Sequence, residues 1–229
     1  MKKRLFKIIS AVLILAFLLP LGACAVETGA TALGTEDVQP IEFEDVSPDD
    51  WFYRYVTNGL RFGLIQGVGD GRFEPERNVT RAEFITMLGR LHEYGNETIG
   101  TPGVGSFYAR YLDWAVEMGI IHGNEHGDLM PQSPITREQM AVIVHRYIST
   151  FELWEYFYSD FGVVAMPFQD DDISYWAWDA IENLREFILF SFDRSWYFRP
   201  RDNASRAETL QILVRICSAV YDLEHPMGR

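Results

Sequence analysis

The sequence predicts an all-α protein in which three helix-loop-helix repeats pack against each other. The block NVTRAEF (78–84) returns as PITREQM (134–140) and as NASRAET (203–209). Each block aligns without a gap back to an aromatic residue near the start of its repeat, namely Trp51, Phe107 or Trp176. A single helical hairpin of this size cannot bury its own apolar face, whereas three hairpins can do so by packing against each other.

The first helix of each repeat is predicted from apolar residues at matching offsets. In the first repeat we expect Ser47 to be its N-cap and Pro48 to occupy the first helical position. The spacing is that of a helix with one buried side. The residues expected to face inward are Tyr55, Val56 and Phe62; Tyr111, Leu112 and Met118; and Ala180, Ile181 and Phe187.

The second helix of each repeat follows the pattern of a capping box, in which a Thr or Ser precedes a Glu or Gln by three residues. The pairs are Thr80 with Glu83, Thr136 with Gln139, and Ser205 with Glu208. Apolar residues then recur on one side of the helix. They are Met87, Leu88 and Leu91; Ile143, Val144 and Tyr147; and Ile212, Leu213 and Ile216.

These patterns divide the chain into five parts. We expect a signal peptide at 1–23, a flexible tether at 24–40, and repeats at 41–95, 105–150 and 166–222. The linker at 95–106 is rich in glycine. The linker at 150–167 is strongly aromatic, so we expect it to pack on the surface of the helical bundle.

The N-terminal segment predicts secretion. The basic start MKKR precedes an apolar run that is short for a membrane span, as in a secretory signal peptide. Leu21 to Cys24 resemble a bacterial lipobox, in which Cys24 would carry lipid and tether the chain to a membrane. Ordinary cleavage after Ala25 also fits the small residues at this place, so both outcomes stay open.

Composition argues against several classes of function. The net charge of −13 argues against nucleic acid or an anionic membrane held by bulk charge. The His and Cys residues show no zinc-ligand spacing, and we expect neither a metal nor a cofactor. Cys217 lies in an apolar helical run and is expected to be buried. Because the acidic residues fall at cap and turn positions and no nucleophile motif is present, we expect no enzymatic activity.

The first repeat, FEDVSPDDWFYRYVTNGLRFGLIQGVGDGRFEPERNVTRAEFITMLGRL, resembles an S-layer homology repeat. It has that family's F-x-D-V start, a Trp opening the first helix, a G-[IL]-[IV]-x-G loop, a D-G-x-F-x-P turn and an [IV]-T-R-A-E helix start. The second repeat keeps GIIHG and ITREQ but has Phe107 in place of the Trp. The third keeps FQDDDISYWAWDAI and FRPRDNASRAE, whereas ILFSF replaces the glycine loop.

The resemblance implies that the three repeats pack as a pseudo-threefold helical prism. It also implies a non-catalytic module that holds a secreted protein in the bacterial cell envelope. In this family, grooves between neighbouring repeats bind a secondary cell-wall polysaccharide attached to peptidoglycan, in many members through a pyruvylated amino sugar. The alternative is an envelope lipoprotein with degenerate sugar sites, acting as a structural scaffold or through a protein partner. The divergent third repeat favours this alternative.

The principal binding candidates are Arg81, Arg137 and Arg206. A cation in the first turn of a helix is unfavourable by roughly a few tenths of a kcal/mol, yet all three repeats have one there. We expect the guanidinium and free backbone N–H groups of the helix N-terminus to receive a carboxylate, such as that of the pyruvyl group. The alternative is a structural Arg paired with an acid of the next repeat, such as Asp45 or Asp170.

The remaining candidates each have a competing structural interpretation. Thr80, Thr136 and Ser205 contact the ligand or only cap their helices. Trp51 and Trp176 stack on sugar or belong to the core. Asp45 and Asp170 contact the ligand, cap the first helix or hold the Arg. Gly67 and Gly123 are expected to permit an unusual backbone angle near the groove. Phe192 takes this place in the third repeat, so we expect only one or two working grooves.

Overall fold

The computed structural model describes residues 43–101, 105–158, 170, 172–185, 189–190 and 197–221. All of them belong to one compact unit, Gln39–Arg229. Every regular element within these residues is a helix, which confirms the predicted all-α class. The predicted signal peptide, the tether with Cys24, and the residues Phe187 and Phe192 lie outside the described residues.

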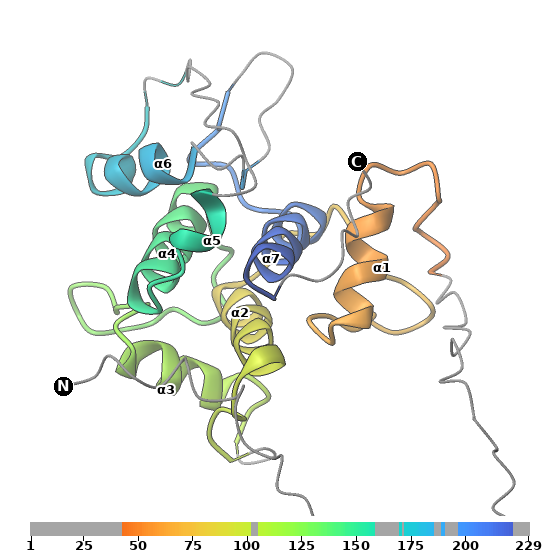
Figure 1. Cartoon of the computed structure of the whole chain (residues 1–229), viewed down its shortest axis with the longest axis horizontal. Helices are drawn as coiled ribbons and strands as arrows, with labels where there is room; N and C mark the ends of the chain where they lie inside the picture. Colours follow the sequence, from red (N-terminus) through yellow and green to blue (C-terminus); the bar gives the residue numbers. More distant parts are fainter. Residues whose placement is uncertain are drawn as a thin grey trace, which may run out of the picture. The chain divides into compact units, whose positions relative to one another are not determined.

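Each repeat contributes two main helices (Figure 1). The first repeat forms α1 (Tyr53–Arg61) and α2 (Arg81–Gly95), and the second forms α3 (Ala109–Glu117) and α4 (Arg137–Thr150). The third forms a 3-10 helix, η1 (Tyr175–Ala177), that leads into α6 (Trp178–Arg185), and then α7 (Arg206–Tyr221). A short helix, α5 (Glu155–Tyr158), follows the second repeat.

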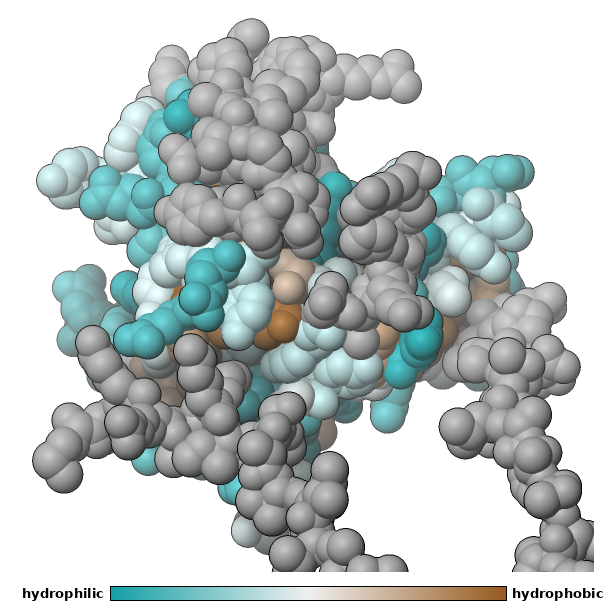
Figure 2. Space-filling model, in the orientation of Figure 1, coloured by the Kyte–Doolittle hydropathy of each residue, from teal (hydrophilic) through white to brown (hydrophobic). Residues whose placement is uncertain are grey.

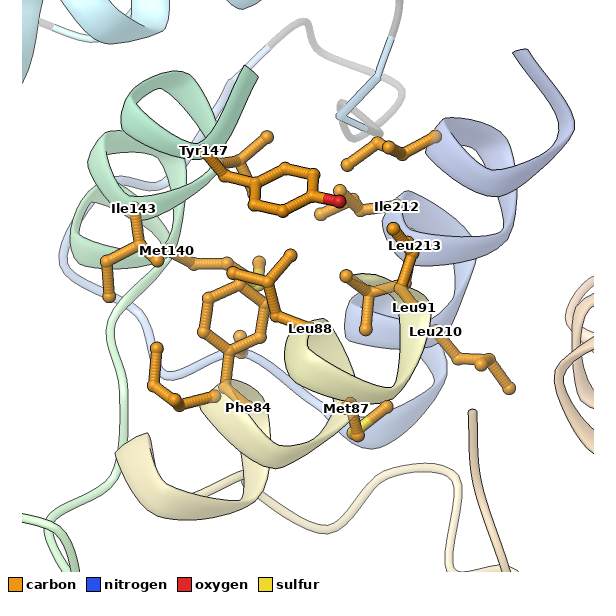
Figure 3. Close-up of a cluster of buried hydrophobic side chains, with 14 of the residues drawn as sticks. Phe84, Met87, Leu88, Leu91, Met140, Ile143, Tyr147, Leu210, Ile212 and Leu213 are labelled. Atoms are coloured by element: carbon orange, nitrogen blue, oxygen red, sulfur yellow. The ribbon is translucent and has the colours of Figure 1, made fainter. Parts of the chain in front are cut away.

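The three second helices share one core (Figure 3). Side chains from α2, α4 and α7 point toward one another there, and all nine second-helix residues that were predicted to face inward are buried. Burying one Leu, Ile or Phe side chain contributes about 1.5–3 kcal/mol. Because each helix buries its apolar side against the other two, the stability of one repeat depends on its neighbours.

Each first helix packs on the second helix of the preceding repeat. The contacting pairs are α3 with α2, α6 with α4, and α1 with α7, so the first repeat follows the third in space. Of the residues predicted to face inward on the first helices, those that the structure describes are buried, apart from Met118. Met118 is 36% exposed at the C-cap of α3, so its predicted burial was wrong.

The predicted cap at Ser47 was also wrong. The α1 helix begins at Tyr53, and its N-cap residue, Phe52, makes no side-chain capping bond. Ser47 instead belongs to a turn ahead of the helix. Its N–H donates to the carboxylate of Asp50 at 2.7 Å, and its hydroxyl oxygen accepts from the N–H of Asp49 at 3.3 Å.

The described part of the aromatic linker packs against α7 through α5. Leu153 and Phe157 are buried within the core, deeper than the surface packing expected for this segment. The described residues on the face shown in Figure 2 are mainly hydrophilic, and hydrophobic residues come into view in a small central area.

Candidate functional site

Each second helix begins with the predicted capping box. In α2 the hydroxyl of Thr80 accepts from the N–H of Glu83 at 3.2 Å, and the Glu83 carboxylate accepts from the N–H of Thr80 at 2.9 Å. The same reciprocal bonds join Thr136 with Gln139, and Ser205 with Glu208. These hydroxyl groups therefore have a structural role that needs no ligand.

The three candidate Arg side chains connect neighbouring repeats. Arg81 Nε donates to the carbonyl of Leu129 in the second repeat at 2.9 Å. Equivalent bonds run from Arg137 to Phe198 in the third repeat at 2.7 Å, and from Arg206 to Phe73 in the first at 2.8 Å. The first helical turn of every repeat is thus bonded to the proline turn of the next one in cyclic order.

The backbone N–H groups of these helix starts are also occupied. In α2 the N–H of Arg81 donates to Ser133 at 3.0 Å, and that of Ala82 donates to Pro131 at 2.9 Å. Corresponding bonds to the next repeat exist in α4 and α7. The expectation of free N–H groups for an anion was therefore wrong, because the neighbouring turn supplies their carbonyl acceptors.

Burial differs among the three guanidinium groups. Arg137 is 1% exposed and pairs with Glu208 at 2.7 Å, whereas Arg206 is 7% exposed and also donates to the Gln66 carbonyl. Arg81 is less buried. Burial lowers the pKa of all three groups below the usual arginine range. An acid of another repeat does pair with Arg137, but it is Glu208 and not Asp45 or Asp170.

A groove with a volume of about 110 Å³ lies between the first and second repeats. We call it the first groove. Its lining combines polar, apolar and cationic side chains from both repeats and from the start of α7: Ile65, Gln66, Glu83, Thr86, Met87, Arg90, Phe107 and Arg206. By register, Arg81 and Trp176 beside α4, and Arg137 and Trp51 beside α7, correspond to Arg206 and Phe107 of the first groove. For the proposals below, we refer to these two places as the second and third grooves.

Arg90, which lines the first groove, belongs to a repeated series of arginines that was not predicted as a binding candidate. Arg90 has the equivalents Arg146 and Arg215, each nine positions after the Arg of the helix start. Arg90 donates to the Leu64 carbonyl at 3.5 Å, and Arg215 makes the equivalent bond to Leu189 at 3.2 Å. The threefold recurrence that singled out Arg81 was equally visible here.

The aromatic residues that open the repeats lie on the surface. Trp51 is 50% exposed, Trp176 is 55% exposed and Phe107 is 64% exposed. Trp51 packs edge-on against Phe52 and Tyr55, which leaves part of its ring accessible. Of the two interpretations considered for the Trp residues, the structure excludes full burial in the core.

Asp45 and Asp170 hold the proline turn of their own repeats. The Asp45 carboxylate accepts from the N–H groups of Phe73 at 2.8 Å and Glu74 at 2.7 Å. Asp170 accepts from the N–H groups of Phe198 and Arg199 at the same register. Burial opposes the charged form of Asp45, but these bonds outweigh it and lower the pKa of Asp45. Neither carboxylate caps the first helix as one alternative expected.

The two loop glycines are needed for close approach and not for an unusual backbone angle. Neither Gly67 nor Gly123 has a positive φ. A Cβ at Gly67 would lie 2.7 Å from the Phe43 ring, and one at Gly123 would collide with the backbone of Gly127. The prediction of an unusual angle was therefore wrong, whereas the requirement for glycine has a steric cause.

The described residues contain neither a metal-binding cluster nor a membrane-spanning helix. No group of three or more His, Cys, Asp or Glu side chains among them is arranged to hold a metal ion. None of their helices is long and apolar enough to cross a membrane. Cys217 is buried as expected, and its burial raises the pKa of the thiol to about 12.

The fold and its groove are those of a binding module built from helical repeats. The S-layer homology domain family matches residues 42–85 and 101–141. The first two repeats of this chain therefore belong to the S-layer homology family, as the resemblance predicted. The third repeat lies outside the matched residues, although its helices and its Arg206 junction follow the same register.

Similar proteins include an amylopullulanase, a surface-layer protein and a cellulosome-anchoring protein. The chain is 31% identical over 176 residues to an amylopullulanase of Thermoanaerobacterium thermosulfurigenes, covering 75% of this chain and 9% of that protein. It is 31% identical over 133 residues to a surface-layer 125 kDa protein of Lysinibacillus sphaericus, covering 53% and 11%. A cellulosome-anchoring protein of Acetivibrio thermocellus is 26% identical over 152 residues, covering 62% and 32%. The chain thus spans about a third or less of these relatives.

These similarities support a cell-surface anchoring role. S-layer homology domains are non-catalytic anchoring modules that bind cell-wall polymers, and the related proteins act at the cell surface. The protein is extracytoplasmic and belongs to the bacterial cell envelope, as predicted.

Proposed function

We propose that this chain is a non-catalytic anchor that binds a secondary cell-wall polysaccharide, linked to peptidoglycan, in the grooves between its repeats. The lining of the first groove carries the proposal. Phe107 presents a 64% exposed aromatic ring, and Arg90 and Arg206 place two cations beside polar side chains of α2. An aromatic face suits the C–H groups of a sugar ring, and a guanidinium suits an anionic substituent such as the pyruvyl carboxylate.

The candidate residues divide by how they would act. Arg81, Arg137 and Arg206 would contribute positive charge to the grooves while they hold neighbouring repeats together. Trp51 and Trp176 would provide the stacking surfaces in the third and second grooves. The capping hydroxyl groups, the two turn carboxylates and the two loop glycines would position the groove walls. Their contacts within the protein support this indirect role.

The N-terminal segment suggests a second attachment. If Cys24 carries lipid, the chain would join a membrane at one end to the cell-wall polymer at the repeats. Mass spectrometry of the purified protein tests this point. A diacylglyceryl mass on Cys24 is expected, and an unmodified N-terminus after Ala25 would remove the membrane attachment.

Sedimentation with purified peptidoglycan sacculi tests the anchor. The chain should sediment with sacculi that carry their polysaccharide and remain in solution with sacculi from which it has been stripped. Phe107→Ala and Arg90→Gln should each reduce retention at least fivefold. Val116→Ala is the matched control, because Val116 is exposed on α3 but does not line the groove.

The helix-start Arg residues are poor choices for this test. Their substitution by Ala would remove bonds between repeats, so lost retention could reflect lost folding. Equal retention on both kinds of sacculi, or on neither, would contradict the anchor. The alternative of a protein-interaction or structural scaffold would then be favoured.

A further inference from the structure

The aromatic residues that open the three repeats are supported in different ways. In the first repeat, Trp51 packs edge-on against Phe52 and Tyr55, with ring centroids 5.4 Å and 6.3 Å apart. In the second repeat, Phe107 packs in the same way against the next residue, Tyr108, at 5.1 Å. A ring that packs against a neighbouring ring is held in a defined orientation.

Trp176 of the third repeat has no such support. The residues that correspond to Phe52 and Tyr55 are Ala177 and Ala180, which have no ring and are themselves buried. Within the described part of the chain, the 55% exposed side chain of Trp176 makes neither a ring contact nor a hydrogen bond. The orientation of Trp176 therefore depends on the backbone of η1.

A buried carboxylate of the second repeat holds this backbone. Glu138 lies in the first turn of α4 and is 6% exposed. Its Oε2 accepts from the N–H of Ser174 and its Oε1 accepts from the Ser174 hydroxyl, each at 3.1 Å. Ser174 is the N-cap residue of η1, but its hydroxyl makes no capping bond and donates to Glu138 instead. The carbonyl of Ser174 accepts from the N–H of Ala177 at 2.9 Å, so the turn that contains Trp176 is closed at the residue that Glu138 holds.

The pair of Glu138 with Ser174 occurs at one contact between repeats. At the other two contacts, the corresponding residues are Ala82 with Gly105, and Ala207 with Asp49. The helix dipole favours an acid in the first turn, but this attraction does not require the acid to be buried. Burial costs the carboxylate its hydration, which the two bonds from Ser174 offset. The carboxylate is thus found at the contact where the supporting rings are missing.

We propose that Glu138 is a positioning residue of the second groove, which acts through Ser174 to hold Trp176 in the orientation that stacks on a sugar ring of the bound polymer. The inference rests on the proposed function and deepens it, since it assigns the position of one ligand contact to a residue of the neighbouring repeat. Glu138 is buried and does not itself touch the ligand. Its contribution to retention should therefore exist only while Trp176 is present.

A double-mutant cycle of retention on sacculi that carry their polysaccharide tests this dependence. Glu138→Ala introduces the residue of the other two repeats and should weaken retention about threefold or more. In the Trp176→Ala background, the same change should have no effect. Glu138→Gln should bind like the wild type, because its amide can accept from the Ser174 N–H and donate to the Ser174 hydroxyl oxygen. Glu155→Ala, which removes an exposed carboxylate from α5, is the matched control and should leave retention unchanged.

Fluorine NMR of the full chain labelled with fluorotryptophan measures the effect on Trp176 without any ligand. Trp176→Phe and Trp51→Phe each assign one signal by its disappearance. Glu138→Ala should shift or broaden the Trp176 signal and leave the Trp51 signal unchanged, whereas Glu138→Gln should leave both unchanged. A general loss of stability would not select one tryptophan, and urea denaturation verifies that each variant is folded under the conditions of the assay.

Three results would each overturn the positioning role. They are an equal loss of retention in the Trp176→Ala background, an unchanged Trp176 signal in Glu138→Ala, and a loss in Glu138→Gln as large as that in Glu138→Ala. The two proposals fail separately. Absence of wild-type retention on sacculi that carry polysaccharide removes the anchor, whereas wild-type retention that Glu138→Ala leaves unchanged removes the positioning role alone.

Discussion

Arg137 Nη1 lies 2.7 Å from Glu208 Oε1, and this ion pair joins the first turns of α4 and α7. The Arg137 side chain is 2% exposed and that of Glu208 is 18% exposed. The same Arg donates from Nε to the Phe198 carbonyl, so one side chain connects the second and third repeats at two points. A buried ion pair need not add net stability, but removing one partner leaves the other uncompensated.

We expect Arg137→Ala to lower the free energy of unfolding by about 3–5 kcal/mol, measured by urea denaturation. Arg137→Lys should fall between this variant and the wild type, because an ammonium cannot reproduce the Nε and Nη donors together. Glu208→Gln keeps the shape of the partner but removes its charge, so it should also lower the free energy of unfolding, because the buried Arg137 loses its carboxylate. An unfolding free energy of Arg137→Ala within about 1 kcal/mol of the wild type would contradict the structural role.

Gly89→Ala tests the close packing of α3 on α2. A Cβ at Gly89 would collide with the Tyr111 ring, which Glu93 and Arg110 hold in place. Alanine normally stabilises a helix relative to glycine, but we expect overpacking here to cost about 1–3 kcal/mol. Gly59→Ala is the matched control. Its Cβ would meet the Leu210 side chain, with the shortest approach, 2.5 Å, to the Cδ1 methyl group at its flexible end. A larger loss in Gly59→Ala would therefore contradict the comparison.

Stability should decrease as the pH falls below 6.5. Burial lowers the pKa of His92 from its ordinary value of 6.5, although the charge of Glu93 opposes the shift. The unfolded chain therefore binds a proton first as the pH falls, and stability present above pH 6.5 is lost below it. The slope for one group is at most about 1.4 kcal/mol per pH unit. Urea denaturation at pH 7.5, 6.5 and 5.5 measures it.

The His92 contribution can be separated from other titrating groups. His92→Phe keeps a ring against Phe151 and should flatten the pH dependence. His145 also has a lowered pKa, caused first by burial and then by Arg146, so some dependence should remain. The acids Asp45 and Glu83 have lowered pKa values and lose their contribution only below their ordinary values of 3.8 and 4.5. An unchanged slope in His92→Phe would exclude His92 as a source.

Trp176→Ala should reduce retention on sacculi without changing stability. Trp176 is 55% exposed and holds the register in the second groove that Phe107 holds in the first. Tyr175→Ala is the control, since Tyr175 is 97% exposed beside it. Both variants should unfold within about 0.5 kcal/mol of the wild type. Equal retention of the two variants would argue against a ligand contact by Trp176.

The features that depend on one helix were predictable from the sequence. Apolar spacing located the buried side of the second helices, and the Thr80–Glu83 pattern gave the capping box found in the structure. The role of Arg81 depends on a neighbouring repeat. In an isolated helix, the backbone N–H groups of the first turn would have no acceptor. In the folded protein, the carbonyl groups of Pro131 and Ser133 accept hydrogen bonds from them. No pattern within one repeat contains that information.

The candidate site was predicted less completely than the fold. The exposure of Trp51 could not be predicted from the sequence, because a Trp at the start of a helix can equally well be buried in the core. The Arg90 series could have been found, because it recurs at one register in all three repeats.

The bonds from α7 to the first repeat have a consequence for how this architecture can change. Arg206 and Ala207 donate to Phe73, Arg77 and Pro75, so the last repeat is bonded to the first. In an open array of repeats, units can be gained or lost at either end, and terminal units need special polar faces. Here the first and the last repeat are bonded to each other, so the array has no open end. Duplication or deletion of a single repeat would therefore leave a junction without a partner. The copy number is therefore fixed by geometry at three.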